Sequence, residues 1–244
     1  MRAEARHNLK HDRFAETITG TAADTFSWAS EHVRNLVLYI VAALVVIGAV
    51  LGGWYWYQHS QEKANEALGH AIQVYQRPLR PAGTPPMPGI ESFTSAGERA
   101  EAARREFGDI ASKYSHTGAG HIAQYFLGLT FRDEGKYSEA ETALKKSADS
   151  GDKDVASLSN YALAQLYQST NRQADAIKTL KYLVDHPTNS VTKLSAQADL
   201  AELYVDAHQP AEAAKVYNQI KSEDPKSPEA QFATQKLATL NTPK

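Results

Sequence analysis

A continuous run of uncharged residues near the amino terminus constrains this chain more than any other feature. From Leu36 to Tyr57 the sequence reads LVLYIVAALVVIGAVLGGWYWY, which is 22 residues without a charge. As a helix this run would be about 33 Å long, enough to cross the ~30 Å hydrocarbon core of a bilayer. Aromatic residues fill positions 54–57 at its end, and such rings favour the membrane–water interface. The run therefore predicts a transmembrane helix over residues 35–57.

Two other interpretations of this apolar run are a buried core helix and a cleaved signal peptide. The length of the run and its aromatic end disfavour a core helix. The apolar region of a signal peptide spans about 7–15 residues behind a short basic segment. This run is longer and begins after 35 residues, so a retained signal anchor is the better prediction.

The charges beside the apolar run predict its orientation. The tail of residues 1–34 holds five lysine or arginine residues and five acidic residues, and Arg34 lies directly at the boundary. Because positive charge is retained on the cytoplasmic side, this small bias favours a cytoplasmic amino terminus. The residues after Tyr57 would then lie outside the cytoplasm.

The segment 58–94 predicts a membrane-proximal helix followed by a proline-rich loop. Apolar residues recur at helical spacing from Ser60 to Gln76. The next stretch, RPLRPAGTPPMPG at residues 77–89, holds five of the ten prolines, a density that no helix tolerates. We expect an exposed loop there, which serves either as a connector or as a polyproline ligand for a partner.

From residue 95 onward the pattern is helical, and one unit recurs three times, over residues 123–148, 160–184 and 196–220. An aromatic and an alanine recur in the copies with spacings of 36 and 37 residues: Phe131, Tyr167 and Tyr204, and Ala140, Ala176 and Ala213. A period of this size with helix–turn–helix content is typical of an α-solenoid. We therefore predict an all-α fold with a repeat domain over residues 95–244, ended by a capping helix over residues 228–240.

The three copies resemble tetratricopeptide repeats. That family has a large residue, a small residue and an aromatic, then an alanine nine residues later and a closing proline. The second copy follows this order with Leu163, Ala164, Tyr167, Ala176, Leu180 and Pro187. The small residues are needed where the two helices of a pair touch. The first copy departs from the pattern because GDKD, residues 151–154, stands where its closing proline belongs, and the family's tryptophan is missing from every copy.

The order of parts is similar to that of the YfgM-like family, the ancillary subunits of the SecYEG translocon. In both, a short tail, one spanning helix, a helix pair and about three degenerate repeats follow one another, and residues 106–128 look like that family's link into the repeats. The similarity covers roughly residues 35–225, and the proline-rich loop and the long tail depart from it.

This second resemblance implies a single-pass inner-membrane protein with a cytoplasmic amino terminus and a periplasmic repeat domain. It implies a protein-binding adaptor that assists protein translocation, with translocon subunits or periplasmic chaperones as partners. The alternative is a structural scaffold for cell-envelope or cell-division assembly that is built on similar repeats.

The sequence contains no motif that would carry catalysis. It has no phosphate-binding glycine loop, no HExxH and no GxSxG, and without cysteine it has no thiolate chemistry or disulfides. His7 and His11 could share a helix face but have no third ligand in view, so we expect solvated side chains. The net charge of −2 excludes an overall basic nucleic-acid footprint. We expect a protein that is not an enzyme, with no cofactor, metal, nucleic acid or small-molecule substrate.

The resemblance to tetratricopeptide repeats places binding on the concave face, which five positions of each repeat's first helix line. These positions hold Ile122, Tyr125, Leu129, Arg132 and Asp133, then Leu158, Tyr161, Gln165, Gln168 and Ser169, then Ser195, Ala198, Glu202, Val205 and Asp206. The groove residues that we single out are Tyr125, Leu129, Arg132, Tyr161, Gln165, Gln168, Glu202 and Asp206. This mixed lining suits a segment of another protein, and it lacks the Lys/Asn/Arg set that clamps a terminal carboxylate.

Overall fold

The computed structural model describes residues 4–81, 83–85, 89 and 92–240, and of residues 4–32 and 34 it describes the backbone alone. Within these residues the regular structure is α-helical throughout. The contacts divide the chain into two compact units, residues 1–58 and 59–244. Each unit is described by itself.

The first unit consists of the amino-terminal part of α1, Glu4–Gln76. The stretch Asn35–Gln76 contains an apolar window with a mean hydropathy of 2.7, none of which is buried. The large apolar side chains between Leu36 and Tyr57 are exposed, so this run is not a core helix of the described chain. It is long and apolar enough to cross a membrane, and the predicted tail is helical from Glu4 onward.

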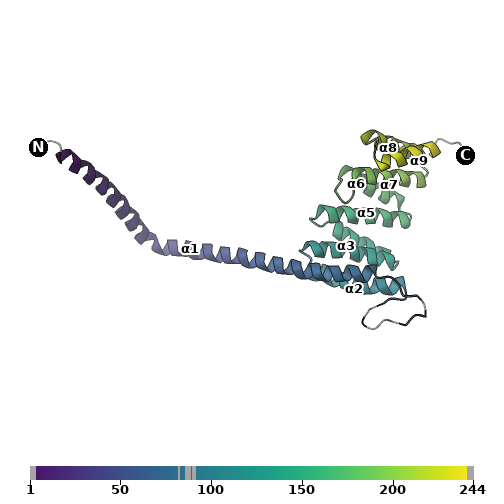
Figure 1. Ribbon diagram of the computed structural model, residues 1–244, viewed down its shortest axis with the longest axis horizontal. Coiled ribbons are helices and arrows are strands. Elements are labelled where there is room, and N and C mark those ends of the chain that lie inside the picture. The colour runs from purple at the N-terminus through teal and green to yellow at the C-terminus, as the bar shows by residue number, and fades with distance from the viewer. Residues whose placement is uncertain (1–3, 82, 86–88, 90–91, 241–244) are drawn as a thin grey trace. The chain divides into compact units, whose positions relative to one another are not determined.

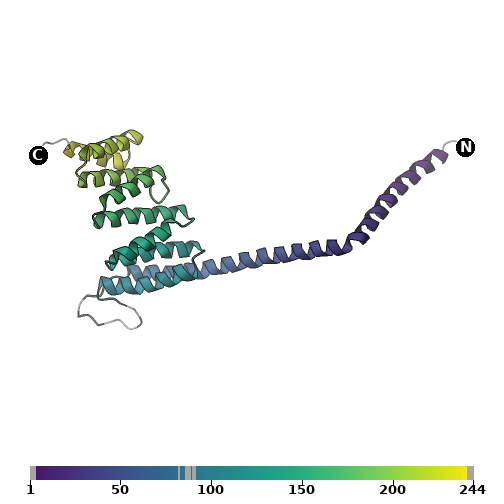
Figure 2. The ribbon, with the colours of Figure 1, turned by 180° about the vertical axis from the view of Figure 1, so that it is seen from behind.

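In the second unit, the helices that follow α1 stack one after another in the order of the chain, as Figures 1 and 2 show from opposite sides. They are α2, Ala96–Lys113; α3, Gly118–Asp133; α4, Tyr137–Ala148; α5, Lys153–Ser169; α6, Gln173–Asp185; α7, Lys193–Asp206; α8, Pro210–Glu223; and α9, Pro228–Leu240. The pairs α3/α4, α5/α6 and α7/α8 correspond to the three predicted copies, and α9 spans the predicted capping helix. The expected all-α solenoid is confirmed.

Each repeat turns between its two helices through the same hydrogen bond. The backbone N–H of Lys136 donates to the carbonyl of Phe131 at 2.9 Å, and the equivalent pairs in the next repeats are Arg172 with Tyr167 at 2.7 Å and Gln209 with Tyr204 at 2.8 Å. The residue before each donor has a positive φ: 76° at Gly135, 61° at Asn171 and 57° at His208. This bond from the sixth residue to the first is the Schellman ending of a helix, which glycine adopts at least cost. The backbone carbonyl of each repeat's aromatic residue therefore accepts the hydrogen bond that closes the turn.

Small residues lie where paired helices approach most closely. A Cβ added to Gly128 would stand 2.6 Å from Cγ of Leu144 on the neighbouring helix α4, so any side chain there would force Leu144 or its helix to move. The three predicted anchor alanines, Ala140, Ala176 and Ala213, are all fully buried. These contacts agree with the helix crossings that the repeat pattern predicts.

The hydrophobic core consists of two clusters of buried side chains. One runs through the repeats from α3 to α9, and the other joins the end of α1 to α2 and α3. In the second cluster the rings of Phe107 and Phe126 stack with centroids 5.0 Å apart, and Tyr75 of α1 meets both at their edges. Phe126 packs against both clusters. The end of α1 thus packs with α2 and α3 at the start of the stack.

The proline-rich loop joins α1 to α2. Its described residues, 77–81, 83–85 and 89, contain no helix. The backbone N–H of Arg80 donates to the carbonyl of Phe93 at 2.8 Å, and the Arg99 guanidinium donates to the carbonyl of Arg77 at 2.9 Å. These two bonds fasten the start of the loop to the segment before α2 and to α2 itself. A role of the loop as a polyproline ligand stays a prediction.

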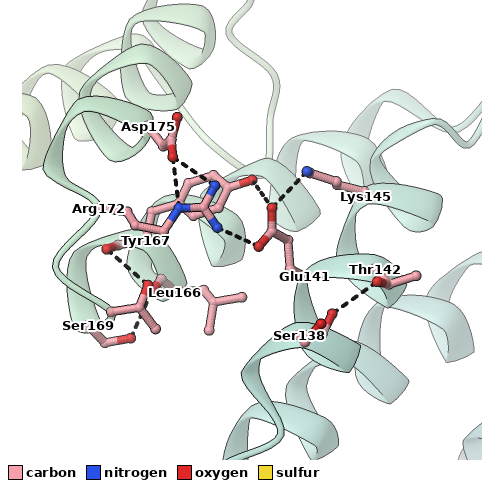
Figure 3. A network of polar contacts seen from close by, with 10 residues as sticks. Ser138, Glu141, Thr142, Lys145, Leu166, Tyr167, Ser169, Arg172 and Asp175 are labelled. Carbon is pink, nitrogen blue, oxygen red and sulfur yellow. Dashed lines mark hydrogen bonds and ion pairs between the residues drawn. The ribbon is translucent and has the colours of Figure 1, made fainter.

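A network of charged side chains connects the first repeat to the second (Figure 3). The carboxylate of Glu141, on α4, accepts three hydrogen bonds. The donors are Nη1 of Arg172 at 2.5 Å, Nζ of Lys145 at 2.7 Å and the hydroxyl of Tyr167 at 3.1 Å. The Arg172 guanidinium also covers the Tyr167 ring, 4.3 Å from its centroid, and pairs with Asp175. Partial burial would raise the pKa of Glu141, but these three hydrogen bonds outweigh that effect and lower it to about 2.

Candidate functional site

Three of the predicted groove residues belong to α3 and differ in how far they reach solvent. Tyr125 is half-buried, and its ring meets the edge of Phe126 at a centroid distance of 5.3 Å. Leu129 is buried in the core cluster of the repeats and offers little surface to a partner. Arg132 is half-buried and pairs with its neighbour Asp133 at 3.2 Å. Of these three, Tyr125 and Arg132 retain exposed surface for a partner.

The other five predicted groove residues lie around one pocket of about 220 Å³. Tyr161, Gln165 and Gln168 come from α5, and Glu202 and Asp206 come from α7. The remaining lining residues are Ala164, Leu180, Asp199, Val205, Tyr217 and Lys236. The structure thus brings together residues that the sequence places about 40 positions apart, because the first helices of adjacent repeats lie next to each other.

The polar side chains of this pocket are tied to one another across the helices. Nε2 of Gln168 donates to Oδ2 of Asp206 at 3.0 Å, which links α5 to α7. Nζ of Lys236, on the capping helix, donates to Oε1 of Glu202 at 2.6 Å. The Tyr161 hydroxyl is hydrogen-bonded to the Asp199 carboxylate. The pocket is therefore a polar site with hydrogen-bonding groups from four elements when Tyr217 of α8 is included.

Burial changes the protonation behaviour of several of these groups. It raises the pKa of Asp199, and the nearby Glu202 carboxylate raises it further, while the hydrogen bond from Tyr161 lowers it. Burial, followed by the charges of Glu202 and Asp206, raises the pKa of Tyr217 to about 12. The Tyr217 hydroxyl consequently keeps its proton at every physiological pH.

Sequence reasoning did not assign Asp199, Tyr217 or Lys236 to the site. Asp199 is next to Ala198, a position expected to face the groove, and it lines the pocket. Lys236 was expected only to belong to a capping helix. The sequence did carry a signal for Tyr217. This residue, with its polar hydroxyl, occupies the position where the first two repeats have the apolar Leu144 and Leu180.

The pocket is small, and its acidic groups are not arranged around a metal position. Among the residues that the structure describes, no group of three histidine or acidic side chains is arranged to hold a metal ion. Its volume of about 220 Å³ is below the range of about 300–1,000 Å³ that is usual for small-molecule sites.

Comparison with known proteins identifies the architecture. The family model described as "Tetratricopeptide repeat-like domain" matches residues 28–242. Among solved structures, the chain is similar to a candidate kinesin light chain from Podosopora anserina with nearly identical TPR-like repeats, at 15% identity and a TM-score of 0.52 over 74% of this chain and 86% of that chain. A variant of the same protein gives a TM-score of 0.53 at 15% identity over 75% and 86%. At this identity the likeness concerns the fold alone, and no curated protein matches the chain.

Proposed function

Because this chain belongs to the tetratricopeptide repeat-like family, we propose that it is a membrane-anchored adaptor that binds a segment of another protein on the concave side of its repeats. Stacked repeats of this kind present an extended surface for partners. No enzyme family is indicated by the match. The observation that carries the proposal is the pocket between α5 and α7, around which five of the predicted groove residues meet.

The apolar part of α1 supplies the anchor in this proposal. The family match begins at residue 28, before the apolar run, and continues through the repeats. The run and the repeat domain therefore fall within one family pattern. An anchor of this kind raises the effective concentration of the domain near partners in the same membrane.

The partners and the compartment follow from the resemblance to the ancillary translocon subunits. We place the amino terminus in the cytoplasm and the repeat domain in the periplasm of an inner membrane, where translocon subunits and periplasmic chaperones are available. Under the alternative, the same groove would hold components of cell-envelope or cell-division assembly.

Site-specific photo-crosslinking in intact membranes tests this proposal. A photoreactive amino acid replaces Gln165 inside the pocket, and a matched variant carries it at Glu139, which is exposed on α4. We expect protein adducts from position 165 that are missing from position 139. Adducts with translocon subunits or chaperones support the translocation role, and adducts with envelope-assembly proteins support the scaffold role. Identical adduct patterns at both positions would contradict binding in the groove.

A further inference from the structure

The third repeat carries a polar atom where the first two repeats carry a methyl group. Tyr217 takes the place of Leu144 and Leu180, on the second helix of its repeat. Its side chain is fully buried, and its ring meets the edge of Phe232 at a centroid distance of 6.3 Å. Among the described residues, the Tyr217 hydroxyl has no hydrogen-bond partner. A buried polar group without a partner is costly to the folded state, so this hydroxyl calls for an explanation outside the packing of the repeat.

Tyr217 belongs to the lining of a pocket that is rich in carboxylates. Three acidic side chains of α7, Asp199, Glu202 and Asp206, line the same pocket. Tyr217, Glu202 and Asp206 line this one pocket together. One ammonium group, that of Lys236, stands against these three carboxylates. The pocket is therefore an acidic site that is also lined by a tyrosine whose buried hydroxyl has no hydrogen-bond partner among the described residues.

We propose that this pocket binds the cationic side chain of a lysine or arginine carried by an extended segment of another protein. This inference rests on the proposed function as an adaptor and adds the chemistry of its ligand. The cation would donate to the Tyr217 oxygen and to the carboxylates of Glu202 and Asp206. Charge-assisted bonds of this type are stronger than neutral ones.

The chain already contains an example of the ligand class. Nζ of Lys236 reaches Oε1 of Glu202 at 2.6 Å, and the same ammonium stands 4.9 Å from the centroid of the Phe232 ring. Both Lys236 and Glu202 are close to half-exposed, so the incoming cation could share or replace this contact. In this arrangement Lys236 competes with the partner for the acidic site.

The ligand's charge is tested with short labelled peptides and the full-length protein in nanodiscs of uncharged phosphatidylcholine. The peptides are identical except for one central residue: lysine, arginine, glutamate or norleucine, which is lysine without its ammonium group. In fluorescence anisotropy titrations, the lysine and arginine peptides should bind about tenfold more tightly than the norleucine peptide. Equal affinity for norleucine would overturn the cation pocket and leave the adaptor proposal intact. If no peptide binds, the pocket is not a ligand site. The adaptor role is tested independently by photo-crosslinking from position 165.

Variants of the pocket make the test specific to its residues. Tyr217→Phe should lower the affinity for the lysine peptide about fivefold or more. The melting temperature of this variant should stay equal or rise, because a buried unpartnered hydroxyl is removed. Tyr217→Leu, which restores the residue of the other repeats, is the second variant if phenylalanine disturbs the fold. An unchanged affinity in the folded Tyr217 variants would refute the role of this hydroxyl.

Two further variants should move the affinity in opposite directions. Glu202→Gln removes a carboxylate and should lower the affinity for the lysine peptide. Lys236→Gln removes the internal competitor and should raise this affinity. Glu139→Gln, on the exposed face of α4, is the matched control and should leave the affinity for the lysine peptide unchanged. Loss of affinity in Lys236→Gln equal to that in Glu202→Gln would contradict the proposed competition and the cation site with it.

Discussion

Glu141→Gln should destabilise the repeat domain in a way that depends on pH. The change keeps the shape of the side chain but removes the charge that Arg172, Lys145 and Tyr167 stabilise. The pKa of Glu141 is about 2, against an ordinary value of 4.5. A difference of about 2.5 pKa units corresponds to at most about 3.4 kcal/mol. Because Arg172 and Lys145 are 43% and 57% exposed, solvent screening reduces the expected loss to about 1–2 kcal/mol at pH 7.

The sign of the pH dependence follows from the lowered pKa. The ionised form is favoured by folding, so Glu141 contributes its full stability above its ordinary pKa of 4.5 and loses it as the pH falls towards 2. At pH 3 about 40% of the contribution remains. The difference in stability between the native chain and Glu141→Gln should therefore shrink by more than half between pH 7 and pH 3.

Chemical denaturation followed by circular dichroism, with the full chain in detergent micelles, measures both quantities. Glu139→Gln removes a charge from the exposed face of the same helix and serves as the control that should change little. The reasoning fails if Glu141→Gln costs as much at pH 3 as at pH 7, because the loss would then come from packing and not from charge. It fails also if the two variants are equally stable at pH 7.

Four other outcomes are expected. Ala176→Leu overfills the contact between α5 and α6 and should cost about 1–3 kcal/mol in denaturant unfolding; an unchanged midpoint would mean that the repeat register is wrong. His208→Gly relieves a positive φ of 57° and should add about 0.5–1 kcal/mol, raising the melting temperature by a few degrees. Combining Tyr125→Ala with Tyr161→Ala should weaken partner binding roughly thirtyfold, the effect of about 2 kcal/mol, with the helical content retained. Protease added to spheroplasts should digest the repeat domain and spare residues 1–34, whereas protection of the repeats until lysis would reverse the proposed topology.

The repeat architecture could be predicted from the sequence because its determinants are local. The spacing of Tyr167 from Ala176 lies within one helix pair, and the same spacing recurs in the other copies. Pro228 begins α9 at the predicted position, since proline is well tolerated in the first turn of a helix. Patterns of this length specify helices and their pairing before any long-range contact is considered.

The pocket could be predicted only in part because it depends on contacts between repeats. The periodic positions placed Gln165 and Glu202 on neighbouring first helices, and both line the pocket. The same rule pointed Leu129 at the groove, where the structure buries it in the core. Two further lining residues come from other helices, Lys236 from α9 and Tyr217 from α8. Those approaches depend on how successive pairs stack, which no single repeat encodes.

The stacking of the helices in chain order has a consequence for how this domain acquires its structure. Among the described residues, most contacts between helices join neighbours along the chain, as α4 with α5 and α6 with α7. Low contact order of this kind favours rapid folding, because few long loops must close before packing is gained. Structure can begin at one pair and spread along the array. A chain that emerges residue by residue can thus dock each new helix onto one already formed, and its growing end exposes a single unsatisfied apolar face at a time.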